Sequence, residues 1–514
     1  MESAMMGKGA ESTRSDVAIL LVSLGMVAAC AITYELLIGT VSSYYLGSSV
    51  LHFSLTIGLF LFFLGIGAFL SKFVSRDELE VFVWTELLLG FVGIGSVLVL
   101  QASFSLTDHY YLVALILLAT IATLCGLEVP LLTRLIYRHQ GLSATLAHAL
   151  SIDYVGGLVG SVLFPIVLLP TFGTLKTGCL VGLLNVGVAS LVVYHFRAVL
   201  RHRGILTILC AGGILLGVSQ FAVAERLVSL LEQSVYDDEI VYADQSPYQR
   251  IILTQHKNDL RLYLNGDLQF SSVDEHRYHE PLVHIPMQLA KQRGAVLLLG
   301  GGDGLAAREI LSYPEVSSLT IVDLDWKVTA LATTHALMRS INKKSLSDPR
   351  VTLIHDDAWQ FVHNTSSLFD VIIADLPDAN DYGLGKLYSR EFYRRASRIL
   401  SSGGVFITQA ASPFFTRNAF WCIAHTVAAA FPVTTPLHNT IPSFGSWGYV
   451  LASHAVPLTL ESLPLPTTLR YLTKELIPTL GIFDGDTSEV PTEIQRLDSQ
   501  VLVRLYADGW ERFD

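Results

Sequence analysis

Hydrophobic residues are distributed unevenly along this chain and divide it into two parts. Between Val17 and about Ala224 charged residues are scarce and apolar runs are long, whereas the remainder mixes apolar and polar residues in ordinary proportions. A helix needs roughly 20 apolar residues to cross a bilayer. About seven stretches come near that length: 17–40, 51–74, 81–103, 110–136, 147–170, 174–196 and 204–224. The pattern therefore predicts a transmembrane α-helical domain over 17–225, preceded by an N-terminal tail over 1–16.

The pattern changes after the last apolar stretch. Residues 226–285 predict a linker helix and then a small antiparallel β subdomain, with a hairpin turn at Asn265-Gly266. Over 286–456, apolar runs such as AVLLLG and FDVIIAD alternate with helical segments. Continuous Val, Ile and Leu runs are typical of strands covered on both faces, so we expect a Rossmann-like, largely parallel α/β sheet of the class I methyltransferase type. Residues 457–514 are expected to form a C-terminal extension.

Composition and charge narrow the class of ligand. Hydrophobic residues make up 51% of the 514 residues and charged residues 15%, against about 25% charged in soluble domains, which agrees with a membrane part. The net charge of −11 argues against nucleic acid and favours cationic ligands. The five cysteines are scattered without a CxxC spacing, so we expect no disulfide framework and no metal site.

Acidic residues stand at the carboxyl ends of four successive predicted strands. They are Asp303, Asp323, the pair Asp356 and Asp357, and the pair Asp375 and Asp378. In a doubly wound sheet, ligands bind beyond the carboxyl ends of the strands. One acid after a strand is more often a helix cap or a turn residue than a ligand contact, and Asp303 itself could cap the helix that begins near Leu305. Four neighbouring strand ends with acids favour a functional crevice, because crowded carboxylates repel each other unless a cation joins them.

The glycine turn in LLLGGGDGLAAREIL (297–311) identifies the kind of cation. Such a turn between a strand and a helix usually approaches the phosphates of a nucleotide. Asp303 stands where a phosphate would be repelled, so the group bound there should be positive. An adenosine that carries a sulfonium and an amine fits this crevice, whereas the carboxylate of S-adenosylmethionine would face Asp303.

Five ordered motifs give the chain a resemblance to a known family. They are YQ at 248–249, NGDLQ at 265–269, YHE at 278–280, GGGDG at 300–304 and DLPD at 375–378. Together they resemble the spermidine synthases, or polyamine aminopropyltransferases, over roughly residues 240–455. The apolar spans and KLYSREFY at 386–393 look like the membrane-anchored bacterial branch.

The resemblance implies an activity and a role for each motif residue. The family transfers an aminopropyl group from decarboxylated S-adenosylmethionine, as co-substrate, to an amine such as putrescine. It forms a spermidine-type product and methylthioadenosine, without a prosthetic group or metal, and its soluble relatives suggest a homodimer. Asp375 would be the catalytic acid–base residue. By the same resemblance, the substrate-binding residues would be Gln249, Gln269 and Asp303 for the aminopropyl group, Asp323 for the ribose, Asp357 and Ala358 for the adenine, and Tyr278, His279 and Asp378 for the acceptor amine.

The sequence departs from the family's pattern at a few of these positions. Leu305 stands where a third glycine is common, Asn265 where the hairpin usually has Asp, and Ala379 where proline is frequent. Phe444 replaces a frequent Tyr and so removes a hydroxyl from the amine channel, which leaves the identity of the acceptor open. Trp447 either offers a cation–π face to the acceptor or belongs to the core.

Four acids lie inside the apolar stretches and suggest a second polar site: Glu35, Glu86, Glu128 and Asp153. Acids inside a membrane are costly and usually functional. Either each is hydrogen-bonded between helices, or together they form a cation site or a passage for polyamines.

The orientation of the chain presents a conflict. Lys72, Arg76, Arg134, Arg138, Arg197, Arg201 and Arg203 lie between spans, and Lys8 and Arg14 precede the first. The positive-inside rule places these segments in the cytoplasm, so an odd number of spans would put the soluble domain outside. Because the nucleoside donor is a cytoplasmic metabolite, we expect a multi-pass protein of the inner membrane, in contact with lipid, with a cytoplasmic catalytic domain. An uncounted span or a half-membrane segment among 110–170 would reconcile the positive-inside rule with a cytoplasmic catalytic domain.

Two other functions agree with parts of the sequence. A methyltransferase would share the fold, but Asp303 and the DLPD acids speak against it. A polyamine transporter or sensor would bind ligand in its α/β domain without turnover. A test for methylthioadenosine formation separates these functions from aminopropyl transfer.

Overall fold

The chain folds into two compact units, which are described separately. The computed structural model describes residues 2–46, 49–107, 109–138, 142–455, 458–461, 463–466 and 468–512. The first unit is Met1–Asp237 and the second is Asp238–Asp514.

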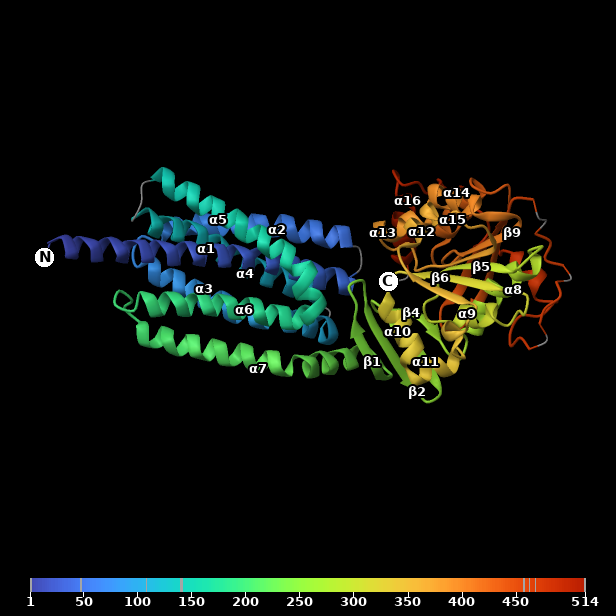
Figure 1. The fold of residues 1–514 in the computed structure, drawn as a ribbon, viewed down its shortest axis with the longest axis horizontal. Coiled ribbons are helices and arrows are strands. Elements are labelled where there is room, and N and C mark those ends of the chain that lie inside the picture. Colours follow the sequence, from blue (N-terminus) through green and yellow to red (C-terminus); the bar gives the residue numbers. More distant parts are fainter. Residues whose placement is uncertain are drawn as a thin grey trace. The chain divides into compact units, whose positions relative to one another are not determined.

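The first unit is a bundle of long helices lying side by side (Figure 1). Its α-helices are α1 (Glu2–Leu46), α2 (Ser49–Leu70), α3 (Glu78–Leu106), α4 (Tyr110–Tyr137), α5 (Leu142–Leu163), α6 (Leu169–His195) and α7 (Arg203–Val235). A 3₁₀ turn η1 (Ser71–Phe73) follows α2, and a π-helical turn η2 (Phe164–Leu168) joins α5 to α6. The residues from 226 to 235, expected as a separate linker helix, are the last turns of α7.

The described residues contain six helices that are long and apolar enough to cross a membrane. We expected about seven such stretches, and the difference lies in Ser143–His195, a continuous helical run of 53 residues. A straight helix of that length would far exceed the ~30 Å hydrocarbon core. The run turns at Gly173, whose φ of 68° lies outside the helical region, so its two arms coincide with the two predicted stretches 147–170 and 174–196. We find no additional span among the described residues of 110–170 that would resolve the conflict over orientation.

Glycines bring neighbouring helices of the bundle close together. A Cβ atom on Gly67 of α2 would lie 2.0 Å from the carbonyl oxygen of Thr123 in α4. On α6, a Cβ on Gly182 would lie 2.7 Å from the carbonyl oxygen of Gly90 in α3. Small residues at helix contacts let backbones pack in the absence of a hydrophobic driving force, as they do in lipid. Large apolar side chains such as Phe62 and Leu215 point outward, which also suits a lipid environment.

The second unit begins with a four-stranded antiparallel sheet in the order β1-β2-β3-β4. These strands are β1 (Glu239–Gln245), β2 (Arg250–His256), β3 (Asp259–Leu264) and β4 (Asp267–Ser271). The predicted hairpin joins β3 to β4, where Asn265 and Gly266 have φ of 52° and 90°. Positive φ at both central residues is what a tight hairpin turn requires and what Asn-Gly adopts readily. The antiparallel subdomain is therefore confirmed.

A seven-stranded, mostly parallel sheet follows, in the order β10-β11-β9-β8-β5-β6-β7. Its strands are β5 (Ala295–Gly300), β6 (Ser318–Asp323), β7 (Val351–His355), β8 (Phe369–Asp375), β9 (Leu400–Gln409), β10 (Val433–Ile441) and β11 (Gly445–Ser453). The strands β5 to β9 pair in parallel, and the hairpin β10–β11 adds an antiparallel edge. This arrangement confirms the predicted Rossmann-like fold.

Helices cover both faces of this sheet. They are α8 (His276–Leu289), α9 (Leu305–Ile310), α10 (Trp326–Thr334), α11 (Ala336–Ile341), α12 (Ala358–Asn364), α13 (Tyr382–Gly385), α14 (Arg390–Arg398), α15 (Arg417–Ala428) and α16 (Val501–Trp510). The 3₁₀ turns are η3 (Ser345–Ser347), η4 (Lys386–Tyr388) and η5 (Ile477–Gly481).

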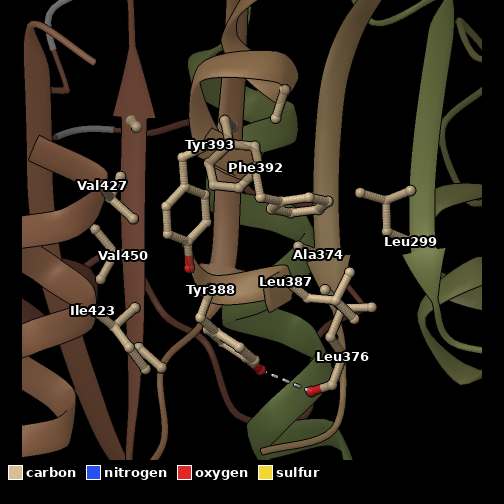
Figure 2. Packing of buried hydrophobic residues seen from close by; sticks show 14 of the residues in the cluster. Leu299, Ala374, Leu376, Leu387, Tyr388, Phe392, Tyr393, Ile423, Val427 and Val450 are labelled. Atoms are coloured by element: carbon tan, nitrogen blue, oxygen red, sulfur yellow. Dashed lines mark hydrogen bonds between the residues drawn. The ribbon is translucent and has the colours of Figure 1, made fainter. Parts of the chain in front are cut away.

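Alternate residues of each strand enter different cores. On β5, Leu297 and Leu299 pack with the residues of α14 and α15, whereas Val296 and Leu298 pack with those of α8 and α9. This follows from the two-residue period of a strand, whose side chains point alternately to the two faces. Figure 2 shows part of the first core, in which the hydroxyl of Tyr388 also donates a hydrogen bond to the carbonyl of Leu376 at 3.2 Å. Because both faces of the sheet are buried, the sequences of these strands are continuous apolar runs.

Candidate active site

The acids predicted at strand ends meet along one edge of the sheet. Their strands β8, β5, β6 and β7 are consecutive neighbours, and all run in parallel. In the register of the sheet, Asp375 lies beside Gly300 and Asp323 beside His355. Since β5 joins β8 on one side and β6 on the other, the chain reverses its winding here, at the place where doubly wound sheets bind ligands.

The glycine turn after β5 is shaped by the acids around it. Gly300 and Gly301 have φ of 81° and 68°, a conformation that side chains disfavour. A Cβ on Gly300 would lie 1.9 Å from the backbone oxygen of Asp375, and one on Gly302 would lie 2.4 Å from a carboxylate oxygen of Asp323. The turn therefore needs glycine because two strand-end acids occupy the space that side chains would take.

Asp303 is held at the tip of this turn. Its Oδ1 accepts a hydrogen bond from the backbone N–H of Leu305 at 2.8 Å, so it supports the start of α9, as the simpler interpretation expected. Burial raises the pKa of Asp303 to about 6, and the positive charge of His279 opposes the increase. The one hydrogen bond and the charge of His279 do not fully offset the cost of removing this carboxylate from water. The carboxylate therefore favours a cation as its ligand.

Asp323 closes the opposite side of the turn. Its carboxylate accepts hydrogen bonds from the backbone N–H groups of Gly302 and Asp325, both at 2.9 Å. Burial raises its pKa to about 6 although both hydrogen bonds lower it. An acid anchored by two backbone groups is well suited to accept hydrogen bonds from a pair of ribose hydroxyls.

Asp375 ends β8 and pairs with a tyrosine from α8. The hydroxyl of Tyr278 donates a hydrogen bond to its Oδ1 at 2.7 Å. Burial raises the pKa of Asp375, whereas His279 and Tyr278 lower it. A desolvated carboxylate oriented by one donor is suited to accept a proton, because burial increases its basicity while the hydrogen bond fixes its direction.

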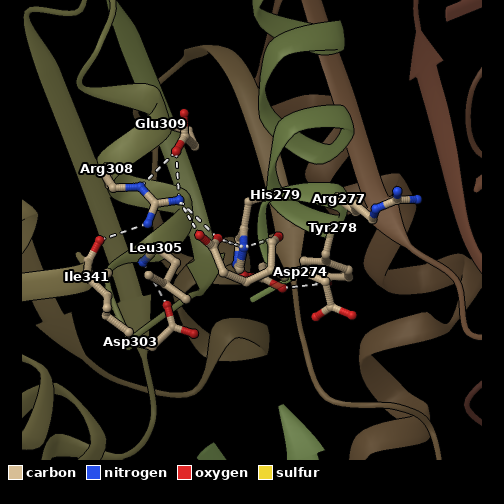
Figure 3. A network of polar contacts seen from close by, with 12 residues as sticks. Asp274, Arg277, Tyr278, His279, Asp303, Leu305, Arg308, Glu309 and Ile341 are labelled. Atoms are coloured by element: carbon tan, nitrogen blue, oxygen red, sulfur yellow. Dashed lines mark hydrogen bonds and ion pairs between the residues drawn. The ribbon is translucent and has the colours of Figure 1, made fainter. Parts of the chain in front are cut away.

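His279 carries a positive charge into this group of acids. Its Nδ1 lies 2.9 Å from the Oε2 of Glu275, and Glu275 is paired with Arg308 at 2.9 Å. Although burial lowers the pKa of His279, Glu275 raises it overall, to about 9. Figure 3 shows Arg308 bridging to Glu309 and to the backbone of Ile341, beside His279 and Asp303. The predicted site residue His279 is thus an imidazolium that stabilises the neighbouring carboxylates.

Asp378 is bound by residues that the sequence did not suggest. Its Oδ1 accepts from the side-chain amide of Gln409 at 3.0 Å, and its Oδ2 accepts from the hydroxyl of Tyr506 at 2.7 Å. Burial raises its pKa to about 6, and both hydrogen bonds oppose the increase. Asp267 of the hairpin also acts on it electrostatically. The polarity of Gln409 at the end of a buried strand was a usable signal, but nothing in the sequence connects Tyr506 to this site.

Asp357 and Ala358 lie at the start of α12. Asp357 is the N-cap, accepting a hydrogen bond from the backbone N–H of Trp359 at 2.8 Å. Its other oxygen pairs with Lys386 of η4. A ligand group that binds the side chain of Asp357 would therefore compete with Lys386. Ala358 is buried directly beside it.

The structure does not join the two predicted glutamines to the acids of the turn. Gln249 donates to Asp325 at 2.9 Å, and Gln269 donates to the backbone of Asp267 at 3.1 Å. Trp447 packs against Phe444 with a ring separation of 5.3 Å, and its buried indole N–H has no partner among the described residues. The tryptophan is thus partly buried against the core and retains a free donor.

The fold and the acids define a class of protein, a Rossmann-like domain with an acidic ligand-binding crevice at the carboxyl ends of its strands. Comparisons identify the family. Residues 275–459 match the Spermine/spermidine synthase domain. The polyamine aminopropyltransferase of Leptospira interrogans is 39% identical over 505 residues, which cover 96% of this chain and 99% of the relative. Polyamine aminopropyltransferase 2 of Ralstonia nicotianae is 41% identical over 507 residues, covering 96% and 98%.

Among solved structures, a spermidine synthase in complex with the transition state analogue AdoDATO is 26% identical, with a TM-score of 0.45, and the match covers 48% of this chain and 86% of that one. The near full-length relatives show that the chain belongs to the polyamine aminopropyltransferase family. It is therefore an enzyme that transfers an aminopropyl group in polyamine biosynthesis, as the motifs predicted.

Proposed function

We propose that the enzyme transfers the aminopropyl group of decarboxylated S-adenosylmethionine to putrescine or a related polyamine, with Asp375 as the base. The observation that carries this proposal is the hydrogen bond from Tyr278 to Asp375, inside a group of partly buried acids at adjacent strand ends. No prosthetic group is needed in this mechanism, because the sulfonium of the donor is already a good leaving group.

The donor would lie across the glycine turn. Asp303 would bind the amine of the aminopropyl group, and Asp323 would accept from the ribose hydroxyls. Asp357 and Ala358 would receive the adenine, which requires the donor to displace Lys386 from Asp357. Gln249 and Gln269 stay part of this proposal, and both would have to exchange their present partners for the ligand.

The acceptor amine would bind among Tyr278, His279, Asp375 and Asp378. An ammonium ion cannot attack, so Asp375 first accepts one proton from it. The free nitrogen lone pair then forms a bond to the carbon beside the sulfonium, and the C–S electron pair returns to sulfur. The products are methylthioadenosine, a polyamine longer by one aminopropyl group, and one proton. A positioned base contributes roughly 10²–10⁴-fold to such a step, and holding both substrates in line contributes further.

The helices of the first unit support a proposal about location. We place the enzyme in the inner membrane as a multi-pass protein in contact with lipid, with the catalytic unit in the cytoplasm, where its donor is made. We also propose a homodimer, by analogy with soluble relatives.

One experiment tests the reaction against its alternatives. The purified full-length protein is incubated with decarboxylated donor and, separately, putrescine, spermidine or cadaverine, and methylthioadenosine is measured. Formation with one acceptor supports the proposal and identifies that acceptor. Its absence with every acceptor contradicts the proposal and leaves a transporter or sensor, while methyl transfer from S-adenosylmethionine in a parallel reaction indicates a methyltransferase.

A further inference from the structure

Two acids are buried together in the middle of the helical bundle without any counter-charge. Glu86 of α3 and Glu128 of α4 are both 0% exposed. Glu86 lies next to Glu128 and to Asn185 of α6. Among the described residues no Lys, Arg or His forms an ion pair with either acid, and the bundle's other ion pairs involve Asp16, Glu78, Glu80 and Glu225.

The polar atoms of this cluster lack hydrogen bonds of good geometry. This holds for both carboxylate oxygens of Glu86, both of Glu128, the side-chain oxygen and nitrogen of Asn185, and the hydroxyl of Tyr34 in the described part of the chain. The polar neighbours of Glu86 are Glu128 and Asn185, which belong to the same cluster. Asn185 and Tyr34 are 0% exposed as well. A buried polar group without a partner costs about 1–3 kcal/mol, and native proteins contain few of them. So many in one place indicate a bound group that satisfies them.

The packing around the cluster is arranged to admit polar atoms. A Cβ on Gly93 of α3 would lie 1.9 Å from the hydroxyl of Tyr34, so glycine at this position leaves room for the phenol of α1. Near Glu128, Pro130 stands inside α4. A proline within a helix removes one backbone hydrogen bond and makes the helix easier to bend, which gives an incoming ligand a way to separate the helices.

The donor set matches a primary ammonium group. An ammonium has three N–H donors and no acceptor, and the cluster offers a carboxylate from α3, a carboxylate from α4 and an amide oxygen from α6, with the ring of Tyr34 from α1 nearby. No group of three or more His, Cys, Asp or Glu among the described residues is arranged to hold a metal ion. The enzyme's own family handles alkylammonium compounds, whose apolar stems suit an apolar bundle.

We propose that Glu86, Glu128, Asn185 and Tyr34 form a second, intramembrane site that binds the primary ammonium end of a polyamine. Two adjacent carboxyl groups without a counter-charge cannot both stay ionised in an apolar bundle, so at least one holds a proton until a cation binds. Binding of the ammonium displaces one proton, which leaves the bundle, so that amine uptake and proton release are linked. Glu35 and Asp153, the other acids predicted in the spans, are not among the neighbours of this pair and are not needed for the site.

Infrared difference spectroscopy on the full-length protein in lipid nanodiscs tests the site. At about pH 8 the proposed substrate-binding carboxylates Asp303, Asp323 and Asp378 are ionised, since their pKa values are about 6. The variants at Glu86 and Glu128 assign the bundle's part of the remaining carboxylic acid band. Spermidine added to the wild type should weaken this band and release a proton into a weakly buffered medium. E86Q and E128Q should lose both signals but keep aminopropyl transfer, which shows that they fold. D153N, a partly exposed acid of α5, is the matched control and should behave as the wild type.

Three outcomes would overturn the proposal. If NaCl or KCl gives the same signals and spermidine adds nothing, the site binds an alkali metal ion. If the band responds to pH alone, the pair binds only protons. If the signals of E128Q equal those of the wild type, the ammonium binds elsewhere and the acids have a structural role.

Discussion

The hydroxyl of Tyr506, in the last helix of the chain, donates a hydrogen bond to Asp378 at 2.7 Å. Asp378 belongs to the DLPD motif after β8, so the C-terminal extension contributes directly to the proposed acceptor site. The helix α16 is held there by packing against α15. A segment that sequence composition marks only as an extension thus completes the polar surroundings of an acid that we propose binds the acceptor.

Replacing Tyr506 by Phe should weaken binding of the acceptor. A hydrogen bond to a charged group contributes about 1.5–3 kcal/mol, so we expect the KM for the acceptor to increase roughly 10-fold or more, with the KM for the donor unchanged. Steady-state kinetics with each substrate varied in turn measures both. Tyr242→Phe is the control, because this tyrosine of β1 also donates to a carboxylate, Asp244, at 3.2 Å. Equal changes in both KM values would refute the assignment of Tyr506 to the acceptor.

Asp375→Asn should abolish turnover while the protein still folds. The amide cannot accept a proton from the acceptor ammonium, and the lost general base predicts a decrease in kcat of roughly 10²–10⁴-fold. Donor binding, measured by calorimetry, should remain close to the wild type, and the Tm should be no lower than that of the wild type, because burial raises the pKa of Asp375 as well. Tyr278→Phe, which keeps the carboxylate and removes its donor, should lower kcat by a smaller factor. Near-normal turnover of Asp375→Asn would remove this residue from the mechanism.

The charge of His279 should set the pH dependence of the reaction. Glu275 raises the pKa of His279 to about 9, and the resulting imidazolium lowers the pKa values of Asp303 and Asp375. Glu275→Gln should therefore return His279 to its neutral form near neutral pH. Both acids would then hold their protons more tightly, so the acidic limb of the profile of kcat/KM against pH should move to higher pH.

The chain offers a matched control for this shift. Glu309 also pairs with Arg308, and its pKa is lowered to about 2, but its imidazole partner is His284, outside the site. Glu309→Gln should leave the acidic limb in place. An unshifted limb in Glu275→Gln, or the same shift in both variants, would count against the role given to His279.

The sequence predicted the acids of this site better than their partners. The positions of Asp303, Asp323 and Asp375 were predictable because the last two end buried strands and the first lies in the turn after one, and parallel strands end at the same edge of a sheet. The helical reversal at Gly173 and the contact of Tyr506 with Asp378 were not, since both depend on the path of the chain in space. Gln249 and Gln269 were assigned by motif alone, and in the structure they donate to Asp325 and to the backbone of Asp267. The partners of these side chains are set by tertiary contacts, which no local sequence pattern encodes.

Asp303→Asn should stabilise the protein while weakening donor binding. Burial raises the pKa of Asp303 in the folded state to about 6, above the ~3.9 of an unfolded chain. Stability is therefore lost as pH rises between these two values, and the full cost, roughly 2–3 kcal/mol, is present above about pH 6. Asparagine removes this cost and can still accept from the N–H of Leu305. Thermal unfolding should show a higher Tm than the wild type at about pH 8 and no difference at about pH 4.

Although Asp303→Asn should be more stable than the wild type, it should bind the donor more weakly. The loss of a charged contact with the aminopropyl amine predicts a decrease of roughly 10–100-fold, measurable by calorimetry with decarboxylated S-adenosylmethionine. Asp357→Asn is the comparison, because that carboxylate is paired with Lys386 and its neutralisation should give no increase in Tm. A lower Tm for Asp303→Asn at about pH 8 would show that the charge is compensated in the folded protein.

The orientation of the bundle gives the last prediction. The start of α1 and the end of α7 lie at opposite ends of the bundle (Figure 1). The helices α2, α4 and α6, whose ends are followed or occupied by basic residues, end on the side of the bundle where α1 starts, so the positive-inside rule alone would place the end of α7 outside the cytoplasm. Because the nucleoside donor is made in the cytoplasm, we expect the end of α7 and the catalytic unit to face the cytoplasm despite this rule. A tag at the C-terminus should be digested by protease in inside-out vesicles and protected in right-side-out vesicles. The basic residues of the loops oppose this orientation, so Arg197→Glu and Arg201→Glu together should increase the fraction of chains whose tag faces the cytoplasm. Digestion of the tag only in right-side-out vesicles would instead place catalysis on the outer face of the membrane.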